Sequence, residues 1–183
     1  MRNFRILMVG TELAPLVSSG GLADVLAALP AALRELGADV RIVMPAFRQI
    51  PHHQRGPVIG SVSVFLNGRE QVGAIREALS PPSGVPLYLI EHEGYYGREA
   101  LYGSSAHEYH DNPERFAFFC HAVLQGIPMT GWKPDVVQCH DWHTAIIPLL
   151  LKTSLAEHPF WQGTRSLCTI HNIAFQGRYS YSS

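Results

Sequence analysis

The segment CTIHNIAFQG, residues 168–177, has the pattern of an apolar strand that ends in hydrogen-bonding side chains. Its polar residues at that end are His171, Asn172 and Gln176. Polar side chains at the end of a buried strand are costly to leave without partners, so they bind either the backbone of a loop or a ligand. The residue types alone leave these two alternatives equally open.

A second cluster, His140, Asp141, Trp142 and His143, directly follows the apolar run 136–139. A carboxylate and an imidazole beside an aromatic ring suit a sugar, whose hydroxyls need donors and acceptors while its C–H face packs on an apolar surface. The same residues invite a zinc site and a metal-dependent hydrolase, but the sequence holds no HExxH or CxxC companion. A third alternative is that Asp141 only caps a helix and the histidines are surface groups.

A third cluster, SSGGL at residues 18–22, lies between an apolar run and a helical pattern. Gly20 and Gly21 allow a ligand to approach the backbone, and free amides at the start of a helix favour a phosphate. The cluster fits neither GxGxxG nor the P-loop pattern, so no dinucleotide or Walker site is indicated. The alternative is a simple tight turn. Asp24 falls in the first helical turn, where a carboxylate complements the helix dipole.

The elements that must position these clusters alternate between strand and helix. Residues 4–9 predict a first strand, and apolar residues at spacings of three and four predict a helix from Leu22 to Leu36 that ends at Gly37. Residues 40–44 predict the next strand. We expect these elements to form a parallel β-α-β unit with a right-handed crossover.

The remainder of the chain continues the alternation around one long loop. Residues 94–112, rich in Gly, Tyr and Ser, predict a loop of a kind that is usually functional or mobile. Asn112 as N-cap and Pro113 in the first turn predict a helix after it. The other expected elements are strands at 58–66, 69–79, 85–90, 136–139 and 166–170 and a helix at 144–155. Together they predict one doubly wound α/β domain.

The composition is that of one soluble domain. The chain has 183 residues, of which 46% are hydrophobic. The net charge is −1 and no run of Lys or Arg occurs, so we expect neither nucleic acid nor membrane as a partner. The first apolar run is too short to cross a bilayer and no signal-peptide pattern follows, which predicts a cytoplasmic protein. Cys120, Cys139 and Cys168 stand among apolar residues, and we expect all three to be reduced and buried.

In combination and in order, the motifs resemble the bacterial glycogen synthase and plant starch synthase family. The resemblance runs from the first strand to the last residues. The matching pieces are Glu12 with Pro15, GGLADV at 20–25, Leu29 with Pro30, Pro45, Tyr102 with Gly103, Asp111 and Asn112 with Arg115 and Phe116, PDVVQCHDWHT at 134–144 and TIHNIAFQG at 169–177. The resemblance implies a Rossmann-like α/β domain, the amino-terminal half of a GT-B glycosyltransferase.

The resemblance also implies an activity for the whole protein. This activity is transfer of glucose from ADP-glucose to the nonreducing end of an α-1,4-glucan, as in glycogen or starch synthesis, with retention of configuration. Residues 1–183 would be the acceptor-side domain, and the carboxyl-terminal, nucleotide-binding half of the same protein would be absent from them. We therefore expect the isolated chain to be inactive. We expect no cofactor and no metal, with ADP-glucose and the glucan as substrates.

Residue roles carried over from the family are roles in positioning. No side chain is an implied covalent nucleophile, so catalysis would rest on orientation and charge stabilisation. His171 would contact the sugar 6-hydroxyl, with its main-chain carbonyl facing the reacting carbon, and Asp141 would hydrogen-bond the transferred glucose. The implied catalytic residues are His171 and Asp141, the donor-binding residues are Ser18, Gly20, Gly21, Tyr102 and Asn172, and the acceptor-binding residue is Asp24.

One position departs from the family pattern. The family commonly has Lys two residues before the paired glycines, where it contacts the donor phosphate, and this chain has Ser18. A neutral hydroxyl in place of a charged donor costs about 1 to 2 kcal/mol of donor binding if nothing compensates. Ser18 therefore motivates a second hypothesis, a non-catalytic module that binds glucan or sugar nucleotide. It also leaves the choice between ADP-glucose and UDP-glucose open.

Overall fold

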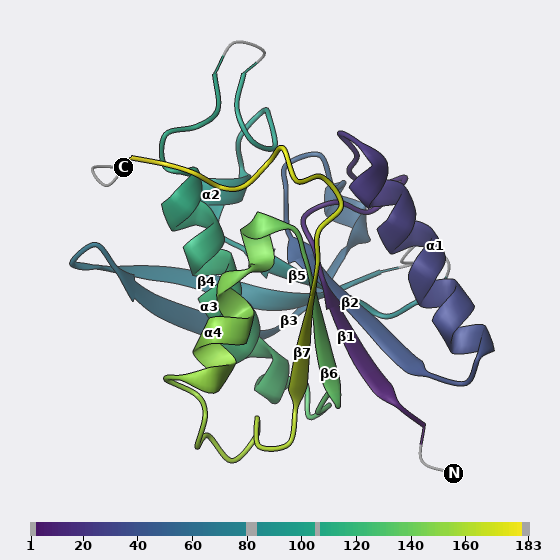
Figure 1. Ribbon diagram of the computed structural model, residues 1–183. Helices are drawn as coiled ribbons and strands as arrows, with labels where there is room; N and C mark the ends of the chain where they lie inside the picture. The colour runs from purple at the N-terminus through teal and green to yellow at the C-terminus, as the bar shows by residue number, and fades with distance from the viewer. Residues whose placement is uncertain (1–2, 80–83, 105–106, 181–183) are drawn as a thin grey trace.

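The structure, a computed structural model, describes residues 3–79, 84–104 and 107–180 (Figure 1). Its strands are β1 (Arg5–Val9), β2 (Asp39–Pro45), β3 (Arg55–Leu66), β4 (Arg69–Ala78), β5 (Leu87–Glu91), β6 (Val136–His140) and β7 (Arg165–Thr169). Its helices are α1 (Gly21–Glu35), α2 (Glu93–Tyr96), α3 (Asn112–Met129) and α4 (Ile146–Lys152). Short 3-10 turns occur at His52–Gln54 (η1) and Trp142–Thr144 (η3).

All the strands belong to one sheet in the order β3-β4-β5-β2-β1-β6-β7. The run from β5 to β7 is parallel. By contrast, β3 and β4 form an antiparallel hairpin that extends the sheet beyond β5. Asn67 and Gly68 join the hairpin with positive φ angles of 48° and 74°, as a tight hairpin turn requires. The hairpin pairs the two strands that the sequence predicted at 58–66 and 69–79.

Helices cover both faces of the parallel strands, as expected for a doubly wound fold. In Figure 1, α1 lies on one side of β1 and β2, while α3 and α4 lie on the other side. The chain winds outward from β1 through β2 to β5, and α3 then carries it back across to β6. The direction of winding therefore reverses between β1 and β6.

The core is continuous across the parallel strands and both helical layers. In β1, every residue from Ile6 to Val9 is buried, because helices cover both faces of that strand. Burial of each such aliphatic side chain contributes about 1.5 to 3 kcal/mol to folding. At the end of β1, a β-carbon on Gly10 would overlap the side chain of Leu26, so glycine there lets α1 pack against the strand.

Several sequence expectations are wrong in detail. Asp111, not Asn112, is the N-cap of α3, because the Asn112 side chain instead bonds the Tyr102 carbonyl and Arg115. Residues 94–96 of the expected 94–112 loop belong to helix α2, and Ser105 and Ala106 of that loop lie outside the described residues. The expected 144–155 helix is shorter, since the 3-10 turn η3 precedes it and it ends at Lys152.

The cysteine expectation holds for two of the three residues. Cys120 and Cys139 are buried and free, but Cys168 is exposed. Cys168 lies in β7, which has β6 as its partner on one side and no described strand on the other. An edge strand buries less of its side chains than a central one, which is why an apolar sequence context misled the prediction.

Candidate active site

The carboxyl ends of β1, β6 and β7 lie side by side, because these strands are parallel neighbours. A cavity of about 530 Å³ lies at these ends, where the winding reverses. In Figure 1 the yellow segment after β7 passes above the strand ends, near the first turn of α1. The cavity is lined by Glu12, Ser19, Gly20, Gly21, Leu22, Val25, Tyr102, Glu108, Asn112, Asp141, Trp142, His143, His171, Asn172 and Phe175.

Glu12, three residues after the end of β1, organises the turn at residues 18–21, here called the glycine turn. Its buried carboxylate accepts hydrogen bonds from the Ser19 amide (2.5 Å), the Ser19 hydroxyl (2.7 Å) and the Gly20 amide (3.2 Å). The amides of Gly21 and Leu22 follow in the first turn of α1, where no preceding helical carbonyl is available to them. Sequence reasoning noted Glu12 only as part of a motif. Its signal was a carboxylate placed shortly after a buried strand.

The two glycines leave open space on the cavity side. A β-carbon on Gly20 or Gly21 would meet no protein atom within 4 Å. Gly20 has extended backbone angles, φ −168° and ψ −166°, that any residue adopts, so backbone strain does not require glycine there. The arrangement fits the expectation that a ligand comes close to the backbone at this turn.

Tyr102 lines the cavity on the same side as the glycine turn and shares the Glu12 carboxylate with it. Its hydroxyl donates to Glu12 Oε1 at 2.8 Å and lies 2.8 Å from the Thr11 hydroxyl. Burial, together with the nearby Glu12 carboxylate, raises the pKa of Tyr102 well above its ordinary value. The phenol is therefore a neutral donor that ties the 101–112 loop to the end of β1.

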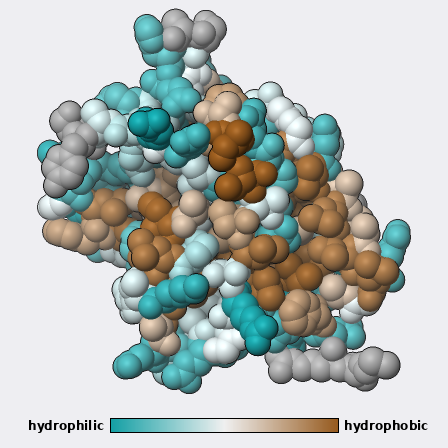
Figure 2. All heavy atoms as spheres, in the orientation of Figure 1, coloured by the Kyte–Doolittle hydropathy of each residue, from teal (hydrophilic) through white to brown (hydrophobic). Residues whose placement is uncertain are grey.

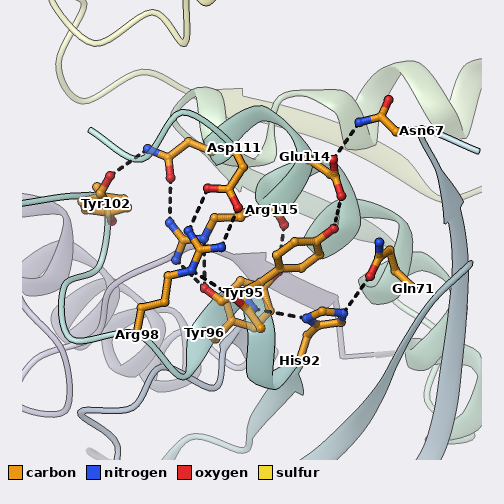
Figure 3. A network of polar contacts seen from close by, with 12 residues as sticks. Asn67, Gln71, His92, Tyr95, Tyr96, Arg98, Tyr102, Asp111, Glu114 and Arg115 are labelled. Carbon is orange, nitrogen blue, oxygen red and sulfur yellow. Dashed lines mark hydrogen bonds and ion pairs between the residues drawn. The ribbon is translucent and has the colours of Figure 1, made fainter. Parts of the chain in front are cut away.

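A buried arginine holds the loop that carries Tyr102. Arg115 is fully buried, and its guanidinium donates to the carbonyl oxygens of Tyr95 (2.7 and 2.9 Å) and Leu101 (3.0 Å) and to Asn112 Oδ1 (2.6 Å). Asn112 Nδ2 donates in turn to the Tyr102 carbonyl at 2.8 Å. Figure 3 shows this network with Tyr102 at one end and the β3–β4 hairpin residue Asn67 at the other. Arg115 and Asn112 of α3 thus hold the loop in place through these hydrogen bonds.

Asp141 and His171 come together from adjacent strands. Asp141 follows β6 with a positive φ of 58°, a strained conformation for a residue other than glycine. Its Oδ1 accepts the His171 backbone amide at 2.8 Å, and the Asp141 amide donates to the Thr169 carbonyl. His171 Nε2 lies 2.8 Å from His140 Nδ1. The strand ends therefore deliver the two implied catalytic residues to one place.

Asn172 both supports the loop and lines the cavity. Its Oδ1 accepts the Ala174 amide at 3.0 Å, which forms a local turn. Farther along, Gly177 packs on Trp142 so closely that a β-carbon there would overlap the indole. The alternatives of loop support and cavity lining are therefore not exclusive for this segment.

The histidines of the second cluster are not surface groups. His140 is fully buried, and the ring of His143 packs between the rings of Tyr102 (centroids 4.9 Å apart) and Trp142 (4.2 Å). Burial, helped by the positive charge of Arg115, lowers the pKa of His143 to about 3. The expected helix cap is also absent: Asp141 precedes the 3-10 turn η3, and its side chain makes no capping bond.

The chemistry of the lining suits an uncharged, hydroxyl-rich ligand. Among the described residues that line the cavity are the carboxylates Glu12, Glu108 and Asp141, and no Lys or Arg. Carboxylates accept hydrogen bonds from hydroxyls, whereas they repel phosphate. In the described part of the chain, no group of three or more His, Cys, Asp or Glu residues is placed to hold a metal ion. That part also contains no helix long and apolar enough to cross a membrane.

Two residues with implied roles lie outside this lining. Ser18 is exposed and faces a neighbouring hollow, which shares Ser19, Tyr102 and Glu108 with the cavity. Asp24 is exposed on the first turn of α1 and does not line the cavity. The structure thus brings together His171, Asp141, Asn172, Tyr102, Gly20 and Gly21 but not Ser18 or Asp24.

Comparisons with known proteins show the family of the chain. Residues 5–183 match the family model of the starch synthase catalytic domain. The chain is 45% identical over 177 residues to glycogen synthase 2 of Geobacter sulfurreducens, covering 96% of this chain and 36% of that protein. It is 39% identical over 175 residues to a glycogen synthase of Anoxybacillus flavithermus, covering 94% of this chain and 35% of that protein.

A solved structure extends the comparison to the fold. The catalytic domain of starch synthase IV from Arabidopsis thaliana, bound to ADP and acarbose, matches with a TM-score of 0.82 and 27% identity. The match covers 96% of this chain and 35% of that one. The chain therefore spans about a third of the length of the relatives it matches. The family match, the relatives and the shared fold show that this chain belongs to the starch synthase catalytic domain family, with the α/β fold of its GT-B enzymes.

Proposed function

We propose that the full-length protein is a retaining glucosyltransferase that extends an α-1,4-glucan at its nonreducing end with glucose from ADP-glucose. Residues 1–183 would form its amino-terminal, acceptor-side domain. The observation that carries the proposal is the cavity at the ends of β1, β6 and β7, which gathers Asp141, His171 and Asn172. The membership of the chain in the starch synthase family supports the class of reaction, glucosyl transfer.

The cavity is suited to the sugar part of the donor. Asp141 and Asn172 offer oxygen acceptors and an amide donor to glucose hydroxyls, and His171 offers a ring nitrogen. Trp142 and Phe175 offer apolar surface to the C–H face of the ring. Catalysis on this side would consist of orienting the glucose and excluding water, with no covalent intermediate on these side chains.

The charge of the donor would be neutralised mainly by the other half of the protein. The described cavity lining contains no cation, so the pyrophosphate meets only the amides of Gly21 and Leu22 on this side. The carboxyl-terminal half would supply the positively charged groups. This division of roles also supports the proposal that the isolated chain is inactive.

ADP-glucose is the proposed donor, and the cytoplasm is the proposed location. The starch synthase IV relative is bound to ADP, which supports adenine over uracil as the base of the donor. The likeness to glycogen synthases supports the proposed location.

The full-length protein tests the proposal directly. Purified protein is incubated with glycogen and radiolabelled ADP-glucose or UDP-glucose, and label in the glucan is counted. We expect incorporation from ADP-glucose at a rate at least tenfold above that from UDP-glucose, and none from residues 1–183 alone. Transfer from UDP-glucose as the better donor would contradict the donor assignment. Appreciable transfer by residues 1–183 would contradict the division of the site.

A second function, binding without transfer, is favoured by one observation. Ser18 stands at the usual lysine position and lines the neighbouring hollow, so this position offers no charged contact to donor phosphate. A protein whose migration in a gel is slowed by maltooligosaccharides, but which transfers no glucose, would fit this function. Glucose transfer in the assay above would exclude it.

A further inference from the structure

His140, which neither the motif nor the proposed function assigns a role, contacts His171 directly. It is the last residue of β6 and is fully buried. Its Nδ1 lies 2.8 Å from Nε2 of His171. The ring centres are 5.1 Å apart and the ring planes differ by only 9°. With nitrogens 2.8 Å apart and ring centres 5.1 Å apart, the rings meet edge to edge in nearly one plane, as an N–H···N hydrogen bond requires.

A hydrogen bond between two imidazole nitrogens contains one proton, so one ring donates and the other accepts. Burial, with a smaller contribution from the nearby His171, lowers the pKa of His140 to about 4. His140 is therefore neutral near pH 7 and carries a single ring proton, on either Nδ1 or Nε2. The surroundings of these two nitrogens decide where that proton sits.

The far nitrogen of His140 has no partner. Its Nε2 is buried and makes no hydrogen bond in the described structure. If His171 donated, His140 would have to carry its proton on Nε2, as a buried N–H without an acceptor. If His140 donates from Nδ1, only a lone pair is left without a partner. Native proteins leave buried donors unpaired less often than buried acceptors, so the second arrangement is favoured.

We propose that His140 is a positioning residue that donates Nδ1–H to His171 Nε2 and thereby holds His171 in the tautomer protonated on Nδ1. The backbone amide of His171 is held at the same time by Asp141 Oδ1. The imidazole is thus fixed at both its backbone and its ring. With Nε2 engaged, Nδ1–H is the ring donor that remains for a sugar oxygen, a consequence that rests on the proposed function.

Nuclear magnetic resonance of the wild-type full-length protein tests the tautomer without any need for activity. Ring nitrogens of ¹⁵N-histidine protein are observed at pH 7.5, and the His171 and His140 signals are assigned by their loss in His171→Gln and His140→Asn. We expect His171 with a protonated Nδ1 and an unprotonated Nε2, and His140 with a protonated Nδ1. A protonated Nε2 on His171 would overturn the proposal.

Kinetics of matched variants test the positioning. His140→Asn places an amide N–H near the position of Nδ1, whereas His140→Leu fills a similar volume without a donor. We expect His140→Leu to lower kcat for glucose transfer at least tenfold and His140→Asn to restore at least part of the loss. The exposed control His53→Leu should leave kcat unchanged. Equal kcat values for the Leu variant and the wild type would contradict the positioning role.

The two tests separate this inference from the proposed function. If the wild type transferred no glucose, the proposed function would fail, and the ¹⁵N spectrum would still decide the tautomer. If His140→Leu does not fold, as its thermal unfolding would reveal, the wild-type spectrum alone decides. An equal loss in His140→Asn and His140→Leu, both folded, would show that the volume of His140 matters rather than its donor, and would also count against the proposal.

Discussion

The two sides of the cavity are built differently. The tyrosine side, formed by Glu12, Gly20 and Tyr102, is held by hydrogen bonds to the buried Glu12 carboxylate and, through Leu101, by the buried Arg115. The histidine side, formed by His171, Asn172 and Phe175, is exposed and depends on short local turns and on two contacts with the end of β6. The difference indicates a tyrosine side that is fixed by buried hydrogen bonds and a histidine side that is open to solvent.

Removal of the support behind the tyrosine side should have the largest effect on stability. Arg115→Met would leave the carbonyls of Tyr95 and Leu101 and the Asn112 amide oxygen without their buried donor. Each such loss costs about 1 to 3 kcal/mol, so we expect the free energy of unfolding to fall by about 3 kcal/mol or more. Chemical denaturation of the full-length protein measures it. The exposed control Arg48→Met should change it by less than about 0.5 kcal/mol. A small effect at Arg115 would mean that the tyrosine side does not need this support.

Removal of the ring on the histidine side should affect catalysis and spare the fold. His171 is exposed, so water can replace its ring as the partner of His140, and His171→Ala should leave the unfolding temperature of the full-length protein nearly unchanged. We expect glucose transfer to fall about 100-fold, the usual loss for one positioned hydrogen-bond donor. Steady-state kinetics with ADP-glucose and glycogen measure it. Unchanged turnover would show that His171 has no role in catalysis and would contradict the proposed contrast between the two sides.

Acid should destabilise the protein through His140 and His143, whose rings are buried next to the cavity. Burial lowers the pKa of His140 to about 4 and that of His143 to about 3, while in the unfolded chain both titrate near pH 6.5. The unfolded state therefore binds more protons below pH 6.5. Stability from these residues is complete above that pH and is lost as the pH falls toward 4 and 3. Each adds a slope of about 1.4 kcal/mol per pH unit across this window.

A variant separates this effect from general acid unfolding. His143→Phe keeps an aromatic ring beside Tyr102 and Trp142 but cannot titrate. We measure the free energy of unfolding of the full-length protein between pH 4.5 and 6.5. In His143→Phe its slope against pH should fall by nearly the contribution of one proton, about 1.4 kcal/mol per pH unit. The control His158→Phe, at an exposed position, should keep the wild-type slope. An unchanged slope in His143→Phe would show that His143 is protonated in the folded protein.

The smallest expected effect concerns a residue just outside the cavity. A lysine at position 18 could reach donor phosphate along the edge of the tyrosine side, although Ser18 itself faces the neighbouring hollow. We expect Ser18→Lys to tighten ADP binding to the full-length protein about tenfold, as measured by calorimetry. Ser18→Met, of similar length and without charge, serves as the control. Equal affinity in the two variants would mean that the phosphate does not pass this position.

The sequence predicted the strands and the place where the polar clusters meet, because polar residues after parallel strands end at one edge of a sheet. It did not reveal how each side is held. Arg115 was visible only as part of a motif, since charged residues are rarely fully buried and no local pattern marks one that is. The supporting roles of Asn112 and Glu12 depend on contacts with residues far along the chain, such as Tyr102. Apolar context alone likewise could not distinguish the edge strand with Cys168 from a central one.

The exposed edge of β7 has a practical consequence for handling residues 1–183 alone. Leu167 is 53% exposed and, just past the strand, Ile170 is 62% exposed, and Figure 2 shows hydrophobic residues gathered across the middle of this face. Unpaired backbone beside apolar side chains is a template for pairing with another chain. The isolated domain should therefore precipitate or form dimers at concentrations where the full-length protein stays dispersed. Leu167→Lys, a charge on that edge, should keep it in solution for binding studies.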